Sequence, residues 1–345
     1  MKKLETLFAA TAALALAVIP AAAQSRPLGD SKFIASIPSP GFPEGIATRG
    51  NKLFASGPAA PGITTPAMVW QYDIKSGHLD AQFPVTISNP FLPFHALSCI
   101  AFGPDGLYAI EPYVGIIRMH LDPHNTQEVY SLFPPPPPAT GSLLNDLTFD
   151  GDGNLYVTDS FQGAIFKIAA GGGAPVVWFQ DPRLLGNPAF PFGVNGIRID
   201  KNSKNVYMTV TFRAGDFSGA VYRLPLVASP AASDLHEFHV YPATTGLPGP
   251  DGIAFGKSGN LYVALNAASM ISVLRPDGTE AAIYAGPAQI PGAFSLLPWA
   301  NPSNITFNNQ QGTLLVTNHA IFVPYDPSLF AIFDVFVNDK AEPLR

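Results

Sequence analysis

The sequence predicts an all-β protein, a six-bladed β-propeller with four-stranded blades around a central metal-binding channel. The first observation is a repeat: the pattern seen as "NDLTF…NLYVT" occurs six times, with copies that start at Glu44, Ser98, Asn145, Asn195, Asp251 and Ser303. The second is that each copy consists of short alternating apolar runs without a helical period. The third is that 31 Gly and 36 Pro supply frequent turns. Short strands repeated about every 50 residues are typical of propeller blades.

Each copy supplies the strands of one blade in chain order. A first run such as "EGIAT" is followed by a second such as "KLFAS", and a third run follows as "MVWQYD", "GIIRMH", "AIFKIA", "AVYRLP", "MISVLR" or "LFAIFDV". A fourth run is clear only in the first five copies, from "AQFPV" to "AAIYA". Because "KFIASI" (residues 32–37) has no blade of its own, we expect it to complete the sixth blade. Residues 24–345 would then form a single propeller domain.

The first 23 residues have the pattern of a secretion signal peptide. Lys2 and Lys3 precede the apolar run "LFAATAALALAVIP", and Ala21, Ala22 and Ala23 form a small-residue cleavage site. No later apolar run reaches the length needed to span a bilayer. We therefore expect an exported protein, periplasmic or secreted, without a membrane span.

Composition limits the partners of this protein. The formal net charge is −6 and only 13% of residues are charged, which argues against binding to nucleic acid or to an anionic membrane. The single cysteine, Cys99, excludes an intramolecular disulfide. The expected partner is a small-molecule substrate, and we expect a monomer.

The residues that start the six copies form a candidate metal site. In a propeller the innermost strands line the axis, so equivalent positions converge there. Two carboxylates beside an apolar core are costly unless they are paired, and the six starting residues include no Lys or Arg. Carboxylate and carboxamide oxygens without His or Cys favour calcium, and magnesium less well. The predicted metal ligands are Glu44, Asn145, Asn195 and Asp251. The alternative is that these side chains are polar caps bonded to neighbouring strands.

A separate calcium loop is excluded. The stretch from Asp150 to Asn154 matches the first five positions of an EF-hand loop, which requires Gly at position 6 and Glu at position 12. Those positions hold Leu155 and Phe161. The stretch is better interpreted as an exposed hairpin turn.

Four segments resemble the senescence-marker-protein/gluconolactonase/regucalcin family: "FPEGIA", "NDLTFDGDGNLYVTD", "VNGIRI" and "PDGIAFGKSGNLYVA". The likeness extends more distantly to paraoxonases and diisopropylfluorophosphatase. It implies a catalytic Ca²⁺ on the axis, with Zn²⁺, Mg²⁺ or Mn²⁺ as alternatives. It also implies that Glu44, Asn195 and Asp251 bind the ion and that Asn145 is a ligand or a substrate contact. Because "PSNITF" resembles a segment of diisopropylfluorophosphatase, Ser303 or Asn304 is expected at the same site.

The sequence departs from these relatives at three places. Leu143 stands where gluconolactonase-like members carry an Arg that contacts sugar. Neither His95 nor His319 matches the His pair of paraoxonases. The second calcium of the fluorophosphatase type would need an acidic residue and a His where this chain has Ala254 and Thr306.

The loops that enter the first strands are rich in aromatic residues and proline, which predicts an apolar pocket over the metal. Among their aromatic residues, Phe94, Phe192 and Trp299 are expected to contact substrate, together with Ser98. His95 lies three residues before Ser98 and is a candidate general base, although a loop hydrogen bond is the alternative. Strand parity also directs Glu111 and His319 to this face.

These features favour a metal-dependent hydrolase of a lactone or related ester, with an apolar substrate. Asp251 would activate water or attack the substrate directly, while calcium would polarise the carbonyl group. Organophosphate hydrolysis is the nearest alternative. A non-catalytic ligand-binding propeller with a structural calcium is the second.

Overall fold

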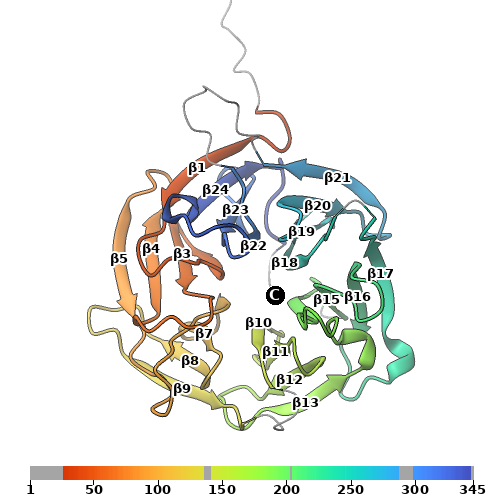
Figure 1. Ribbon diagram of the computed structural model, residues 1–345, viewed down its shortest axis with the longest axis horizontal. Helices are drawn as coiled ribbons and strands as arrows, with labels where there is room; N and C mark the ends of the chain where they lie inside the picture. Colours follow the sequence, from red (N-terminus) through yellow and green to blue (C-terminus); the bar gives the residue numbers. More distant parts are fainter. Residues whose placement is uncertain (1–25, 136–140, 203, 245, 287–297, 343–345) are drawn as a thin grey trace, which may run out of the picture.

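The computed structural model describes residues 26–135, 141–202, 204–244, 246–286 and 298–342. These residues form a ring of six antiparallel sheets with four strands each (Figure 1). The prediction of an all-β, six-bladed propeller is confirmed. The predicted signal peptide, residues 1–23, lies outside the described residues.

The strands follow the chain from the inside of each blade to its outer edge. Blades 1 and 2 consist of β2 (Ile46–Arg49), β3 (Lys52–Gly57), β4 (Met68–Asp73) and β5 (Leu79–Pro84), then β6 (Ile100–Phe102), β7 (Leu107–Glu111), β8 (Gly115–Met119) and β9 (Gln127–Leu132). Blades 3 and 4 consist of β10 (Leu144–Phe149), β11 (Leu155–Asp159), β12 (Ala164–Ile168) and β13 (Val176–Gln180), then β14 (Val194–Ile199), β15 (Asn205–Val210), β16 (Gly219–Pro225) and β17 (His236–Tyr241). Blade 5 consists of β18 (Pro250–Phe255), β19 (Leu261–Leu265), β20 (Met270–Leu274) and β21 (Glu280–Ala285).

The sixth blade combines both ends of the chain. It contains β22 (Pro302–Asn308), β23 (Thr313–Asn318) and β24 (Ala331–Phe336), and its outer strand is β1 (Ser31–Ser36). β1 pairs antiparallel with β24, from Ser31 opposite Val335 to Ser36 opposite Ala331. The expectation that "KFIASI" closes the ring is therefore confirmed. Without β1, the outer edge of β24 would be unpaired and could pair with a strand of another chain.

The hydrophobic core lies mainly between neighbouring blades. One cluster joins Tyr156 and Ile165 of blade 3 to Val206 and Met208 of blade 4. Another joins Ala264 of blade 5 to residues of blade 6. Because the blades pack against one another in this way, their inner strands are held at fixed positions around the axis.

The other elements of the described residues are three short 3₁₀ helices, η1 (Pro182–Leu184), η2 (Ala232–Asp234) and η3 (Pro327–Leu329). Across the described ranges, no helix has the length and hydropathy to cross a membrane. The turn after β10 is a hairpin connection, in which Asp150 accepts hydrogen bonds from the backbone N–H groups of Asp152 and Asn154. This is the turn expected in place of an EF-hand.

Candidate metal centre and its pocket

We call the six residues that start the repeat copies the axial residues. Those of blades 3 to 6 lie at β-bulges in the first strand of each blade. The register shifts between Leu144 and Leu147 in β10, and equivalent shifts occur in β14, β18 and β22. A bulge adds an unpaired residue and redirects its side chain. Asn145, Asn195 and Asp251 lie within these bulges and turn towards the axis, whereas Glu44 and Ser98 lie just before β2 and β6.

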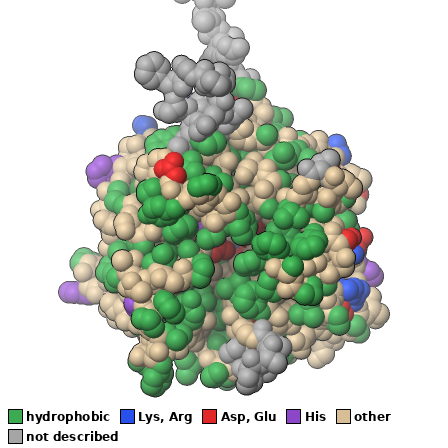
Figure 2. Space-filling model, in the orientation of Figure 1, with side chains coloured by type: hydrophobic (Ala, Val, Ile, Leu, Met, Phe, Trp, Pro, Cys, Tyr) green, Lys and Arg blue, Asp and Glu red, His purple; other side chains and the backbone are tan. Residues whose placement is uncertain are grey.

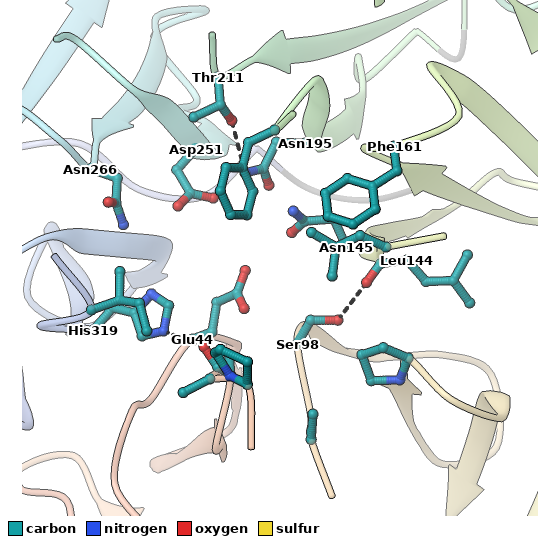
Figure 3. Close-up of a pocket in the computed structure, with 18 of the residues that line it drawn as sticks. Glu44, Ser98, Leu144, Asn145, Phe161, Asn195, Thr211, Asp251, Asn266 and His319 are labelled. Carbon is teal, nitrogen blue, oxygen red and sulfur yellow. Dashed lines mark hydrogen bonds between the residues drawn. The ribbon is translucent and has the colours of Figure 1, made fainter. Parts of the chain in front are cut away.

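The four predicted metal ligands line one cavity of about 370 Å³, together with Ser98 and Phe192. Glu44, Asn145, Asn195 and Asp251 are each between 5% and 7% exposed. Figure 3 shows their side chains pointing into a common space, although each comes from a different blade. The alignment of the repeats therefore identified residues that converge.

Hydrogen bonds fix which end of each axial carboxamide faces the cavity. The Ser160 hydroxyl donates to the Val194 carbonyl (2.7 Å), so it must accept from Asn145 Nδ2 (3.0 Å). In the same way, Thr211 donates to the Pro250 carbonyl (3.1 Å) and accepts from Asn195 Nδ2 (3.0 Å). The carboxamide oxygens are then left for the cavity. Asn145 Oδ1 is buried and has no hydrogen-bond partner among the described residues, which fits the oxygen ligand of a cation.

Hydroxyl groups on the second strands hold the backbone of the axial residues. Ser56, Thr158, Thr209 and Thr317 donate to the carbonyls of Ser98, Asn195, Asp251 and Glu44, over 2.7 to 2.9 Å. Each bond joins one blade to the next, and the last joins blade 6 to blade 1. This role was not predicted from the sequence, although the Ser or Thr at the end of "KLFAS", "NLYVT" and "TLLVT" is its signal.

The electrostatics of the cavity favour a cation. Burial raises the pKa of Glu44 well above its ordinary value, and the negative charges of Asp251 and Asp146 raise it further. Burial also raises the pKa of Asp251, again with a contribution from Asp146. No Lys or Arg is among the described residues that line the cavity. A divalent cation would remove the cost of burying these two carboxylates together.

The donor set suits a hard cation. Within the described part of the chain, no three His, Cys, Asp or Glu side chains cluster as metal ligands. Two carboxylates and two carboxamide oxygens form the site instead. All-oxygen sites of this kind are typical of calcium.

Five predicted contact residues do not line the cavity, which corrects those predictions. Phe94 and His95 lie in the loop before Ser98, where the His95 backbone N–H bonds the Ile63 carbonyl (2.9 Å). Trp299 packs in the core between blades 5 and 6 and donates to Ser31 Oγ (3.0 Å). The other two, Ser303 and Asn304, are buried in blade 6.

Hydrogen bonds inside the ring explain why Ser303 and Asn304 do not line the cavity. Ser303 Oγ is 3.1 Å from Thr317 Oγ1 and 3.3 Å from the Pro43 carbonyl. Asn304 accepts from the Ile305 backbone N–H (2.9 Å) and donates to the Cys99 sulfur (3.5 Å). Ser303 therefore joins blades 6 and 1, and Asn304 belongs to a layer beneath the cavity.

The imidazole that does line the cavity is His319. Its Nε2 is 2.7 Å from the Ala59 carbonyl, so Nε2 carries the hydrogen and Nδ1 is an acceptor. Burial lowers the pKa of His319 to about 4, which keeps the ring neutral at pH 7. Figure 3 places it beside Glu44.

The walls of the cavity are apolar. They include Leu143, Phe161, Phe192, Ile321 and Phe322. Phe192 makes edge-to-face contacts with Phe161 and Phe322, at centroid distances of 6.1 and 6.4 Å. Figure 2 shows hydrophobic side chains gathered around a central hollow with acidic side chains at its base.

Several polar side chains of the lining have hydrogens that are committed to other protein groups. Ser98 donates its hydrogen to the Leu144 carbonyl (3.0 Å), and Ser142 donates to Asp159 (2.5 Å). One carboxamide hydrogen each of Asn145 and Asn195 and the ring hydrogen of His319 are likewise committed. Because no Lys or Arg is among the described lining residues, a cation would supply the positive charge that a substrate carbonyl oxygen needs.

The fold and the site define the class of this protein: a six-bladed β-propeller with a candidate cation site on its axis. The chain matches the model of the SMP-30/gluconolactonase/LRE-like region over residues 64–320. It therefore belongs to the SMP-30/gluconolactonase/LRE-like family. Glu44 precedes the matched segment.

Solved structures share the fold at low sequence identity. Regucalcin from Agrobacterium tumefaciens, described as a calcium-binding protein, is 15% identical, with 87% of this chain and 91% of that chain covered and a TM-score of 0.57. A gluconolactonase from Xanthomonas campestris is 15% identical, with 88% of each chain covered and a TM-score of 0.56. A luciferin-regenerating enzyme is 15% identical, with 87% and 93% covered and a TM-score of 0.59. A search of curated protein sequences finds no match.

Proposed function

We propose that this protein is an exported, calcium-dependent hydrolase that opens an apolar lactone or a related ester. The observation that carries the proposal is the orientation of Asn145 and Asn195, whose oxygens face a cavity that already holds two buried carboxylates. Membership of a family named for gluconolactonase supports lactone hydrolysis.

Glu44, Asn145, Asn195 and Asp251 would hold the ion. When bound, calcium supplies positive charge that polarises the substrate carbonyl and stabilises the negative charge that develops on its oxygen. The chain's own groups then have distinct roles. Asp251 accepts a proton from the attacking water, and the neutral His319 offers Nδ1 as an acceptor that orients that water. The apolar walls exclude bulk water from the reacting group.

The apolar walls of the cavity support an apolar substrate. A polyhydroxylated lactone would place hydroxyl groups against Leu143, Phe161 and Phe192, and each unpaired hydroxyl costs about 1–3 kcal/mol. An alkyl or aryl lactone would instead gain about 0.8 kcal/mol for each buried methylene. We expect kcat/KM for an apolar lactone to exceed that for gluconolactone by at least about tenfold.

The experiment is a substrate screen with purified, calcium-loaded protein. Alkyl and aryl lactones, aryl esters, phosphotriesters and gluconolactone are compared, with Asp251→Asn as the inactive control. A gluconolactone rate at or above the apolar rates would refute the apolar pocket. Turnover of phosphotriesters alone would favour organophosphate hydrolysis, the alternative that the same cation and walls would serve.

Two further outcomes separate the remaining alternatives. Tight calcium binding without turnover of any substrate would favour a ligand-binding propeller. If Asp251 attacks the acyl carbon, a mixed anhydride forms; when water then breaks it at the Asp251 carboxyl carbon, a single turnover in ¹⁸O-labelled water leaves the first product unlabelled and places the label in Asp251. Label in the first product would favour attack by water.

A further inference from the structure

A second layer of residues lies directly beneath the axial site. These residues follow the six axial residues by one position, and they are Gly45, Cys99, Asp146, Gly196, Gly252 and Asn304. The glycines permit close approach between strands: a Cβ on Gly196 would lie 2.3 Å from the Asp251 carbonyl oxygen, and one on Gly252 would lie 2.5 Å from Asn304 Oδ1. The three side chains of this layer are buried.

A guanidinium group joins this layer from blade 4. Arg198 Nη1 is 2.7 Å from Asp146 Oδ2 and 2.6 Å from the Ile197 carbonyl, and Nη2 is 3.5 Å from Asn304 Oδ1. Asp146 is 1% exposed and also accepts from the backbone N–H groups of Leu147 (2.7 Å) and Ile197 (3.0 Å). The Arg198 side chain thus connects blades 3, 4 and 6 below the cavity.

The Asp146 carboxylate acts on the axial site without lining it. Asp146 follows the predicted ligand Asn145 directly in β10 and is buried, so its negative charge lies close to the ligand set. Asp146 is absent from the cavity lining, so it would act on a bound ion through space rather than by contact. Arg198 is the cation that partly offsets its charge.

The charges of the two layers match one divalent ion. When ionised, Glu44, Asp146 and Asp251 carry three negative charges and Arg198, which pairs with Asp146, carries one positive charge, so the net charge is −2. The Cys99 thiol adds no charge, because burial raises its pKa well above the ordinary value. A trivalent ion would leave an uncompensated positive charge in this buried site, and a monovalent ion would leave a negative one.

We infer that Asp146 and Arg198 form a charge-balanced pair that keeps the net charge of the axial site and the layer beneath it at −2, the charge that one divalent cation neutralises. The inference deepens the proposed function, because it rests on a cation at Glu44, Asn145, Asn195 and Asp251. It concerns residues that do not contact the ion, so metal binding can be measured without catalysis. A merely structural role would instead tie the blades together and leave the preference for ionic charge unchanged.

The test is calorimetric titration of the metal-stripped full chain with Ca²⁺ and with Tb³⁺. Asp146→Asn removes one negative charge and should weaken calcium binding at least about tenfold. Arg198→Gln makes the site more negative and should raise the affinity for Tb³⁺ relative to Ca²⁺ at least about tenfold. The double variant restores the net charge and should return this ratio to the wild-type value. Arg198→Lys keeps the charge and should also keep the ratio.

Equal Tb³⁺ to Ca²⁺ ratios in the wild type and Arg198→Gln would overturn the inference. If Arg198→Gln does not fold, Asp146→Asn decides, because unchanged calcium affinity in that nearly isosteric variant would equally overturn it. Wild-type protein that binds no calcium would refute the proposed function instead. The two failures are therefore distinguishable.

Discussion

Replacing Ser160 by Ala should weaken the metal site without removing a ligand. Ser160 is fully buried and its hydroxyl fixes the Asn145 carboxamide with the oxygen towards the cavity. Without that hydroxyl, Asn145 Nδ2 loses its acceptor and the carboxamide is free to rotate. Residues that orient metal ligands typically contribute 10- to 100-fold in affinity. We expect the calcium dissociation constant to rise by about that factor, which corresponds to about 1.4–2.8 kcal/mol.

The matched control is Ser131→Ala. Ser131 is 1% exposed and donates to the Gly173 carbonyl over 2.7 Å, the same length as the bond from Ser160 to Val194. Both substitutions should lower the free energy of unfolding of the metal-free protein by about 1–3 kcal/mol. Only Ser160→Ala should change calcium affinity, measured by calorimetry. Wild-type affinity in Ser160→Ala, or an equal loss in Ser131→Ala, would refute the orientation argument.

Three further predictions concern pH, ring closure and substrate choice. Burial raises the pKa of Glu111 to about 7 from an ordinary value of 4.5, so the folded protein holds the proton more tightly than the unfolded chain does. The free energy of unfolding should therefore fall by about 3 kcal/mol between pH 4.5 and 7. In chemical denaturation, Glu111→Gln should show a smaller fall than the wild type, and equal slopes would contradict this. Deleting β1 (Ser31–Ser36) should expose β24 and cause association, whereas a monomer of wild-type stability by light scattering and thermal melting would show that β1 is dispensable. Leu143→Arg should shift kcat/KM from alkyl lactones towards gluconolactone, and an unchanged ratio would remove Leu143 from substrate selection.

The repeat made the propeller and the axial site predictable from sequence. Equivalent positions in a ring of blades converge, so aligning the copies brought Glu44, Asn145, Asn195 and Asp251 together with Ser98. The sixth position, Ser303, bonds Thr317 and the Pro43 carbonyl instead of lining the cavity. The closing strand was predictable because the sixth copy lacked a fourth run and residues 32–37 lacked a blade. These predictions needed only counting along the chain and strand pairing.

The loop residues were less predictable because their side chains can turn either way. Sequence proximity to Ser98 suggested a role for His95, but the fold brings His319 to the cavity from another blade. Trp299 lies on an entering loop, yet its ring is used for packing between blades 5 and 6. The Asp146–Arg198 pair was missed because the two residues are 52 positions apart and meet only when neighbouring blades pack.

The central claim is tested most directly by adding calcium to metal-stripped protein during hydrolysis of an alkyl lactone. The structure predicts negligible turnover without a divalent ion, because the described lining of the cavity contains no Lys or Arg to polarise the substrate carbonyl. Turnover should rise with calcium and saturate at one ion per chain, and Asp251→Asn should remain inactive throughout. Full hydrolysis in the presence of excess chelator, or calcium binding without hydrolysis of any lactone or ester, would contradict the account.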